Sequence, residues 1–305
     1  MTRPAPRLTR RRALFIGAAA AASASLGTQA RAATAEWQGN ALGAHARISL
    51  RHLSQPEAAP VFAAVEAELR RLEAIFSLYR TDSAISALNR DGRLVAPPPE
   101  MLAILTLAAS VHAETGGLFD PTVQPLFRLY AEGAGKVAPG ALEEVLPKVG
   151  FDGLRFDTAG IDFLRPGMGL TLNGIAQGHV TDRIAALLRL EGFRDVLVDI
   201  GEIAALGDGP AGSGWRVQIA DGGPVLELSD RAIATSAALG TVLDQAGTVG
   251  HILHPRKGWI APEHRQVSVV DETAARADAL STAAVLMPAA DLEALETGGR
   301  RIFAL

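Results

Sequence analysis

Near the C-terminus, the segment A-R-A-D-A-L-S-T (residues 275–282) places a carboxylate and a hydroxyl within a run of small, mostly apolar residues. Asp278 and Thr282 are four positions apart, so on a helix both side chains point to the same side. In one interpretation the carboxylate complements the helix dipole and the threonine bonds to its own backbone. In the other, the pair supplies two oxygen ligands to a hard cation such as Mg²⁺, with further oxygens from elsewhere in the chain. These residues alone leave both interpretations open.

A glycine-bearing segment, T-L-N-G-I-A-Q-G-H (residues 171–179), is the best source of a further oxygen. A strand end, a turn and a helix start expose free backbone groups, as phosphate-binding turns do. The segment is not a Walker motif, because no Lys-Ser or Lys-Thr pair follows it. Taken alone, it is more typical of a plain structural turn.

Two other stretches carry reactive side chains. T-G-G-L-F-D-P-T (residues 115–122) puts an acid and hydroxyls just after a glycine pair, and G-H-I-L-H-P (residues 250–255) puts two histidines at the end of a predicted strand. His251, ahead of a proline turn, is a candidate general base near neutral pH. A lone histidine is more often a surface or structural residue, so this alternative also stays open.

The elements that must position these residues follow from hydrophobic periodicity. We expect helices over residues 60–76 and 101–115, the second ending at Gly116-Gly117, and two more after the turn near Asn173 and from about Ala274. Strands are predicted over residues 41–50, 195–200, 215–219, 232–235, 250–253 and 266–270. Helices and strands mix without regular βαβ alternation and no internal repeat is present. The predicted fold class is therefore α+β, with mixed or largely antiparallel sheets packed with helices.

The first 32 residues have the pattern of a secretory signal peptide. Arg10-Arg11-Arg12 precede a short alanine-rich apolar run and the small-residue site Ala30-Arg31-Ala32. The Arg-Arg-x-Leu-Phe core favours the twin-arginine route over an ordinary Sec signal. The apolar run is shorter than the roughly 20 residues of a membrane span. We expect cleavage after Ala32, one domain over residues 33–305, and a periplasmic location.

Composition excludes several kinds of partner and chemistry. The net charge is −4, and residues 1–32 hold six arginines and no acid, so the remaining chain carries about −10. An acidic chain without a basic stripe is a poor candidate for binding nucleic acid or an anionic membrane. The absence of cysteine rules out disulfides and thiolate catalysis.

The order of the chemical segments resembles the ApbE family of flavin transferases along nearly the whole chain after residue 32. The resemblance rests on F-S-L-Y-R with S-A-I-S (residues 76–86), G-L-F-D (117–120), G-I-A-Q-G (174–178), His251-x-x-x-Pro255 and A-D-A-x-x-T (277–282). Within the family the chain looks most like the NosX branch, which is associated with periplasmic nitrous oxide respiration.

The resemblance implies an activity and a set of site residues. Enzymes of this kind cleave FAD with Mg²⁺, release AMP and attach FMN through a phosphoester to a Thr of an acceptor protein. The implied residues are His251 and Asp278 for catalysis; Tyr79, Leu118, Phe119, Asp120, Asn173, His179 and Leu253 for flavin; and the Ala176 carbonyl, Asp278 and Thr282 for the metal. The implied partner is an acceptor flavoprotein with a Ser/Thr flavinylation motif, a membrane-bound, NosR-like electron-transfer protein.

The sequence also departs from the usual family pattern. The common Asp-Leu-Gly-Gly-Ile-Ala-Lys-Gly becomes T-L-N-G-I-A-Q-G here and loses an acid and a lysine. We therefore expect Arg256 or Lys257 to supply positive charge near the phosphates. Two alternatives to the transferase stay open: a non-catalytic flavin-binding or delivery factor, and a Mg²⁺-dependent FAD pyrophosphatase.

Overall fold

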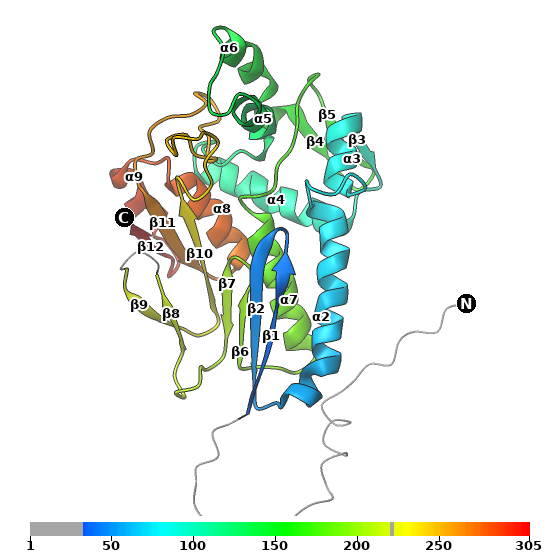
Figure 1. Cartoon of the computed structure of the whole chain (residues 1–305), viewed down its shortest axis with the longest axis vertical. Helices are drawn as coiled ribbons and strands as arrows, with labels where there is room; N and C mark the ends of the chain where they lie inside the picture. The colour runs from blue at the N-terminus through cyan, green and yellow to red at the C-terminus, as the bar shows by residue number, and fades with distance from the viewer. Residues whose placement is uncertain (1–32, 220–222) are drawn as a thin grey trace, which may run out of the picture.

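The computed structural model describes residues 33–219 and 223–305. The predicted signal peptide therefore lies outside the described residues. A seven-stranded sheet in the order β1-β2-β6-β7-β10-β11-β12 forms the centre of the fold, and every neighbouring pair in it is antiparallel (Figure 1). Its strands are Thr34–Ala41, Ala44–Arg51, Val196–Asp199, Ile203–Leu206, Arg231–Ala237, Gln266–Asp271 and Arg301–Ala304. The α+β prediction is confirmed.

Helices α2 (Gln55–Phe76), α7 (Ala176–Leu190) and α8 (Ala274–Ala284) pack on one face of this sheet (Figure 1). The buried face of α2 carries the predicted periodic positions Val65, Leu69, Leu72 and Phe76. This helix begins five residues earlier than predicted, because Glu57 accepts a hydrogen bond from the backbone N–H of Ser54 and so caps the first turn. The apolar core lies between these helices and the sheet.

The remaining elements extend this two-layer core. The helices are α3 (Ala84–Asp91), α4 (Pro99–Glu114), α5 (Gln124–Glu132), α6 (Ala141–Val145) and α9 (Ala289–Leu295), with 3₁₀ turns at Pro121–Val123, Leu146–Lys148 and Phe151–Gly153. A small antiparallel sheet joins β3 (Arg93–Val95), β5 (Gly160–Phe163) and β4 (Leu154–Phe156). The hairpin of β8 (Trp215–Gln218) and β9 (Val225–Leu228) packs its apolar side chains against Ala205, Ile233 and Val270 of the large sheet.

Two predicted strands differ from the structure. Residues 41–50 are not one strand but the turn and second arm of a hairpin, in which Leu42 and Gly43 both have positive φ angles of 49° and 84°. Glu73 accepts a hydrogen bond from the Leu42 N–H and so stabilises this turn from outside the hairpin.

The prediction of a strand over residues 250–253 is wrong. Only one isolated bridge, between Val242 and Gly250, forms there. Leu253 instead packs against Leu126 and Tyr130 of α5. Apolar residues of this stretch are thus buried against a helix, which a short apolar run in the sequence does not distinguish from burial in a sheet.

Between residues 33 and 305, leaving aside 220–222, no helix combines the length and apolar character that a membrane crossing needs.

Candidate active site

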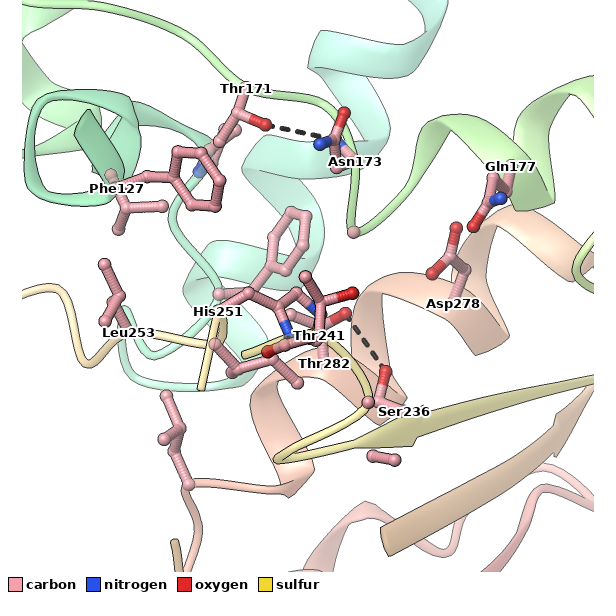
Figure 2. A pocket seen from close by; sticks show the side chains of 18 of the residues that line it. Phe127, Thr171, Asn173, Gln177, Ser236, Thr241, His251, Leu253, Asp278 and Thr282 are labelled. Atoms are coloured by element: carbon pink, nitrogen blue, oxygen red, sulfur yellow. Dashed lines mark hydrogen bonds between the residues drawn. The ribbon is translucent and has the colours of Figure 1, made fainter. Parts of the chain in front are cut away.

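A cavity of about 320 Å³ opens where five segments of the chain meet (Figure 2). The segments are residues 118–127, the turn before α7 with the start of that helix, Glu202 between β6 and β7, the end of β10 with the loop that follows it, and α8 with the residues just after it. Its lining includes Leu118, Phe119, Asp120, Phe127, Asn173, Gln177, Glu202, Ser236, Thr241, His251, Leu253, Asp278 and Thr282. Most of the predicted site residues are therefore brought together.

The close approach of α7 and α8 depends on glycine. The backbone N–H of Gly178 donates to Asp278 Oδ2 at 3.0 Å, and a Cβ at Gly178 would lie 2.5 Å from the Ala274 carbonyl carbon. A Cβ at Gly174 would lie 2.8 Å from Thr282 Oγ1. Gly174 therefore lets the turn before α7 approach the hydroxyl of Thr282, and Gly178 lets the first turn of α7 approach the start of α8 and the carboxylate of Asp278.

Asp278 is buried beside other acids. Asp278 lies on α8 and is only 3% exposed. Burial raises the pKa of this carboxyl to about 7, and the charge of Asp182 makes a smaller contribution in the same direction. Glu202 also lines the cavity, and burial together with the charge of Asp278 raises the pKa of Glu202 well above its usual range. Burial of two mutually repelling carboxylates is costly without a compensating positive charge.

Glu202 was missed as a site residue in the sequence. It follows β6 after a turn in which Gly201 has a φ of 84°, and its Oε2 accepts a hydrogen bond from the Thr235 N–H at 3.1 Å. An acid placed directly after a glycine turn at a strand end was the available signal. Its proximity to Asp278, however, depends on how β6 and α8 pack.

The donor atoms fit a hard divalent cation. Asp278, Glu202 and Thr282 offer carboxylate and hydroxyl oxygens, and in the described part of the chain no Lys or Arg lines the cavity. Oxygen-rich sites of this kind suit Mg²⁺. No three His, Asp or Glu side chains of the described residues gather closely enough to hold a metal by themselves, so hydroxyl, backbone or substrate oxygens must complete the set.

Thr282 is held in place by a small group of hydroxyls. Ser236 Oγ lies 3.3 Å from Thr282 Oγ1 and 2.8 Å from Ser281 Oγ. Ala176, the predicted carbonyl ligand, is the first residue of α7 and is 3% exposed, and it does not itself line the cavity. Its place in the metal site stays a prediction.

His251 reaches the cavity in the form a general base needs. Its Nδ1 lies 3.1 Å from the carbonyl oxygen of Thr241, so this nitrogen carries the proton and donates it. Burial lowers the pKa of His251, which keeps the imidazole neutral at pH 7 and leaves Nε2 with a free lone pair. The other histidine of the motif, His254, is buried and its Nδ1 accepts a hydrogen bond from the Arg256 N–H, so its role is structural.

The other end of the cavity is apolar, with Leu118, Phe119, Phe127 and Leu253 in its lining. Asp120 lies beside them but is committed to the local backbone. Its Oδ1 accepts from the N–H and hydroxyl of Thr122, and its Oδ2 accepts from the Phe151 N–H at 3.1 Å. Asp120 therefore orders the loop that presents the apolar surface.

Several predicted residues lie away from the cavity. Tyr79 is 82% exposed, and His179 packs edge-on against Phe76 with its ring centroid 5.5 Å away. Burial lowers the pKa of His179 to about 4. Arg256 donates to the carbonyl oxygen of Gly116, and neither Arg256 nor Lys257 lines the cavity. The expectation that Arg256 or Lys257 supplies positive charge at this site, in place of the missing lysine, is therefore not met.

Comparisons with known proteins agree with this architecture. A model of the family described as the ApbE family matches residues 42–302. A FAD:protein FMN transferase of Treponema pallidum is 31% identical, with 78% of this chain and 75% of that protein covered. A FAD:protein FMN transferase of Salmonella typhimurium is 28% identical, with 85% and 80% covered.

Among solved structures, the flavinyl transferase ApbE of Pseudomonas stutzeri in its apo form is 26% identical, with a TM-score of 0.78 over 91% of this chain and 94% of that one. The flavin transferase ApbE of Vibrio cholerae, at 24% identity, has a TM-score of 0.78 over 90% and 93% and shares the fold.

Proposed function

The chain belongs to the ApbE family, and from that premise we propose that it is a FAD:protein FMN transferase that acts on an acceptor flavoprotein. It cleaves FAD, releases AMP and joins FMN to a Ser or Thr hydroxyl. The observation that carries this proposal is the shape of the cavity: an apolar end, an oxygen-rich end and one neutral histidine share a single space. The apolar end suits an isoalloxazine ring, and the oxygen-rich end suits a pyrophosphate with its cation. The neutral histidine suits an acceptor hydroxyl.

In the transfer step, the acceptor oxygen bonds to the phosphorus of the FMN moiety while the phosphoanhydride bond to AMP breaks. His251 Nε2 accepts the hydroxyl proton, and AMP leaves with the anhydride oxygen. The Thr241 carbonyl keeps the imidazole in the required tautomer through its contact with Nδ1. Such a transfer depends chiefly on positioning and charge neutralisation, which a closed, preorganised site provides.

Mg²⁺ is the proposed metal, with Asp278 and Thr282 as side-chain ligands. When bound, it supplies Lewis-acid neutralisation of the pyrophosphate charge. Charge balance supports the proposal, because FAD brings two phosphate charges into a cavity whose lining residues include three acids and, among the described residues, no Lys or Arg. Without a bound cation, Asp278 and Glu202 would repel the phosphates of FAD.

The partner and location are further parts of the proposal. The twin-arginine-type sequence of residues 1–32 supports export to the periplasm. With the Asn173-Gly174 turn, it also supports placement in the NosX branch, whose acceptor would be a membrane-bound, NosR-like electron-transfer flavoprotein. Protein recovered from the periplasm should begin at Ala33, and recovery of an unprocessed chain from the cytoplasm alone would contradict this part.

A transfer assay tests the activity. The purified protein is mixed with FAD, Mg²⁺ and an acceptor domain that contains a Ser/Thr motif, and mass spectrometry follows an FMN-sized gain on the acceptor. D278N and H251A should each abolish the gain, whereas D91N and H45A, matched changes at exposed positions, should retain it. AMP release without an acceptor would instead indicate a FAD pyrophosphatase. Tight FAD binding without AMP release would indicate a flavin carrier.

A further inference from the structure

Helices α7 and α8 cap each other. Asp182 of α7 accepts hydrogen bonds from the N–H groups of Ala274 at 2.8 Å and Ala275 at 2.9 Å, the first two residues of α8. In the opposite direction, Asp278 of α8 accepts from the N–H of Gly178 in the first turn of α7. Each helix therefore satisfies free N-terminal N–H groups of the other, and each carboxylate complements the positive end of its neighbour's dipole.

The side chains between these helices do little to define where α8 lies along its own axis. Most of the residues of α8 are alanine, and its buried positions include Ala274, Ala275, Ala277, Ala279, Ala283 and Ala284. Such a surface permits close contact but has few large side chains that interlock with a neighbour, and interlocking is what specifies a packing register. A hydrogen bond with fixed length is more restrictive than contact between small groups.

The first turn of α8 is the part that Asp182 holds, and the site residues follow from it along the same rigid helix. Asp278 lies four residues after Ala274, about 6 Å along the axis, and Thr282 lies one turn further. Any axial shift of the first turn is transmitted to both side chains. A shift of 1 Å would change their distances to Asn173, Gly174 and Gln177 across the cavity, and cation ligands tolerate only small errors.

We propose that Asp182 is a positioning residue, which sets the register of α8 against α7 and so places Asp278 and Thr282 at the spacing that the cation of the transfer reaction requires. This inference rests on the proposed function. Asp182 does not line the cavity. It acts through its two backbone bonds, and its charge makes a smaller, separate contribution at Asp278.

Thr273 provides a matched control. Its side chain accepts from the Arg276 N–H at 3.4 Å and caps the same turn of α8, but it precedes α8 directly and makes no bond to α7. Removing this cap weakens the helix without releasing its register. T273A and D182N should therefore both lower the thermal unfolding temperature, and only D182N should alter the cation site.

The experiment measures Mn²⁺ binding directly, from the electron paramagnetic resonance signal of free Mn²⁺, for the whole protein in the presence of FAD. We expect D182N to raise the Kd for Mn²⁺ by about tenfold or more, as loss of supporting contacts does at metal sites, and T273A to leave it within about twofold of the unaltered protein. D182E is measured beside D182N in every case, because it retains the charge that acts on Asp278. The longer side chain keeps the charge but displaces α8, so the same rise in Kd is expected.

A Kd for Mn²⁺ in D182N or D182E equal to that of the unaltered protein would overturn the inference. An equal rise in this Kd in T273A and D182N would overturn it too. D278N separates this outcome from failure of the proposed function. If Mn²⁺ binding is present in the unaltered protein and lost in D278N, the cation site stands whatever D182N does. If the unaltered protein binds no Mn²⁺ with FAD present, the cation site itself is wrong and the role of Asp182 falls with it.

Discussion

The backbone N–H of Gly178 donates a hydrogen bond to Asp278 Oδ2 across 100 residues of sequence, at 3.0 Å. This bond joins the first turn of α7 to the acid of α8, two segments that the sequence shows only as separate motifs. It also orients the carboxylate so that Oδ1 is left for another partner.

The first prediction concerns Gly178. In G178A the new methyl group would lie 2.5 Å from the Ala274 carbonyl carbon and 2.6 Å from Ala275 Cα, both of them backbone atoms that cannot move aside separately. The helices must separate, so we expect the free energy of unfolding in urea to fall by about 1–3 kcal/mol and FMN transfer to fall with it. Unaltered stability and transfer would show that the contact is looser than the structure has it.

The second prediction concerns stability against pH. Burial raises the pKa of Asp182 to about 6 and that of Asp278 to about 7, from an ordinary value near 4. The folded chain therefore holds these protons more tightly than the unfolded chain does. This proton binding adds to the free energy of unfolding, fully so below about pH 4. The added free energy, on the order of a few kcal/mol, is lost as the pH rises through about 6 to 7.

Urea unfolding at pH 5 and pH 7.5 measures this loss in the metal-free protein. Mg²⁺ with FAD should restore stability at pH 7.5, because the cation favours the ionised carboxylate. D278N, which cannot ionise, should show a smaller difference between the two pH values. The same pH dependence in D278N would mean that other groups are responsible.

The third prediction concerns Glu202. Its charge raises the electrostatic cost of the cavity beside Asp278, but the same charge attracts a cation. E202Q should therefore raise the unfolding temperature of the metal-free protein by on the order of 2 °C and weaken Mn²⁺ binding by about tenfold. E272Q, at an exposed position, should change neither property. A stabilised variant with undiminished Mn²⁺ affinity would remove Glu202 from the cation site.

The fourth prediction concerns the pH dependence of transfer. Burial lowers the pKa of His251, so at pH 6.5 a smaller fraction of its imidazole is protonated than of an ordinary histidine, which is half protonated there. The profile of kcat/KM should fall on the acid side with its midpoint below pH 6.5, as the base becomes protonated. H251Q should lose about 10²–10⁴-fold in rate, and the acid limb should disappear from what remains. An acid limb centred above pH 6.5 would contradict the assignment.

The fifth prediction concerns Gln177, which lines the same cavity as Asp278 and Glu202 and lies beside Asp278 in Figure 2. Q177K introduces the only lysine of the described cavity lining, and its ammonium group would offset part of the negative charge. FAD binding without any divalent cation should tighten by about tenfold, read by quenching of flavin fluorescence, because neutralisation no longer depends wholly on the cation. Q38K, at an exposed position of β1, makes the same change in net charge away from the cavity. If Q38K tightened FAD binding as much as Q177K does, the effect would not be local.

Much of the local structure could be predicted from sequence. The periodic apolar positions of α2 and the glycine pair after α4 marked helices that the structure contains, and Asp278 and Thr282 share a helix face because the α-helical repeat alone requires it. Caps changed the boundaries by a few residues. The hairpin turn at Leu42-Gly43 escaped prediction because a leucine with positive φ is uncommon and its N–H depends on Glu73, 31 residues away.

The sequence by itself determined which residue types could do chemistry and which short segments carry them: an acid and a hydroxyl on one helix, a glycine turn, and a histidine before a proline. These features depend on neighbours within a few positions. The tertiary structure decided which segments meet. It brought Glu202 and Ser236 to Asp278 and Thr282, turned His179 toward Phe76, and left Tyr79, Arg256 and Lys257 outside the cavity. Such proximity comes from the packing of helices on a sheet whose strands lie far apart in the chain, and no local pattern encodes it.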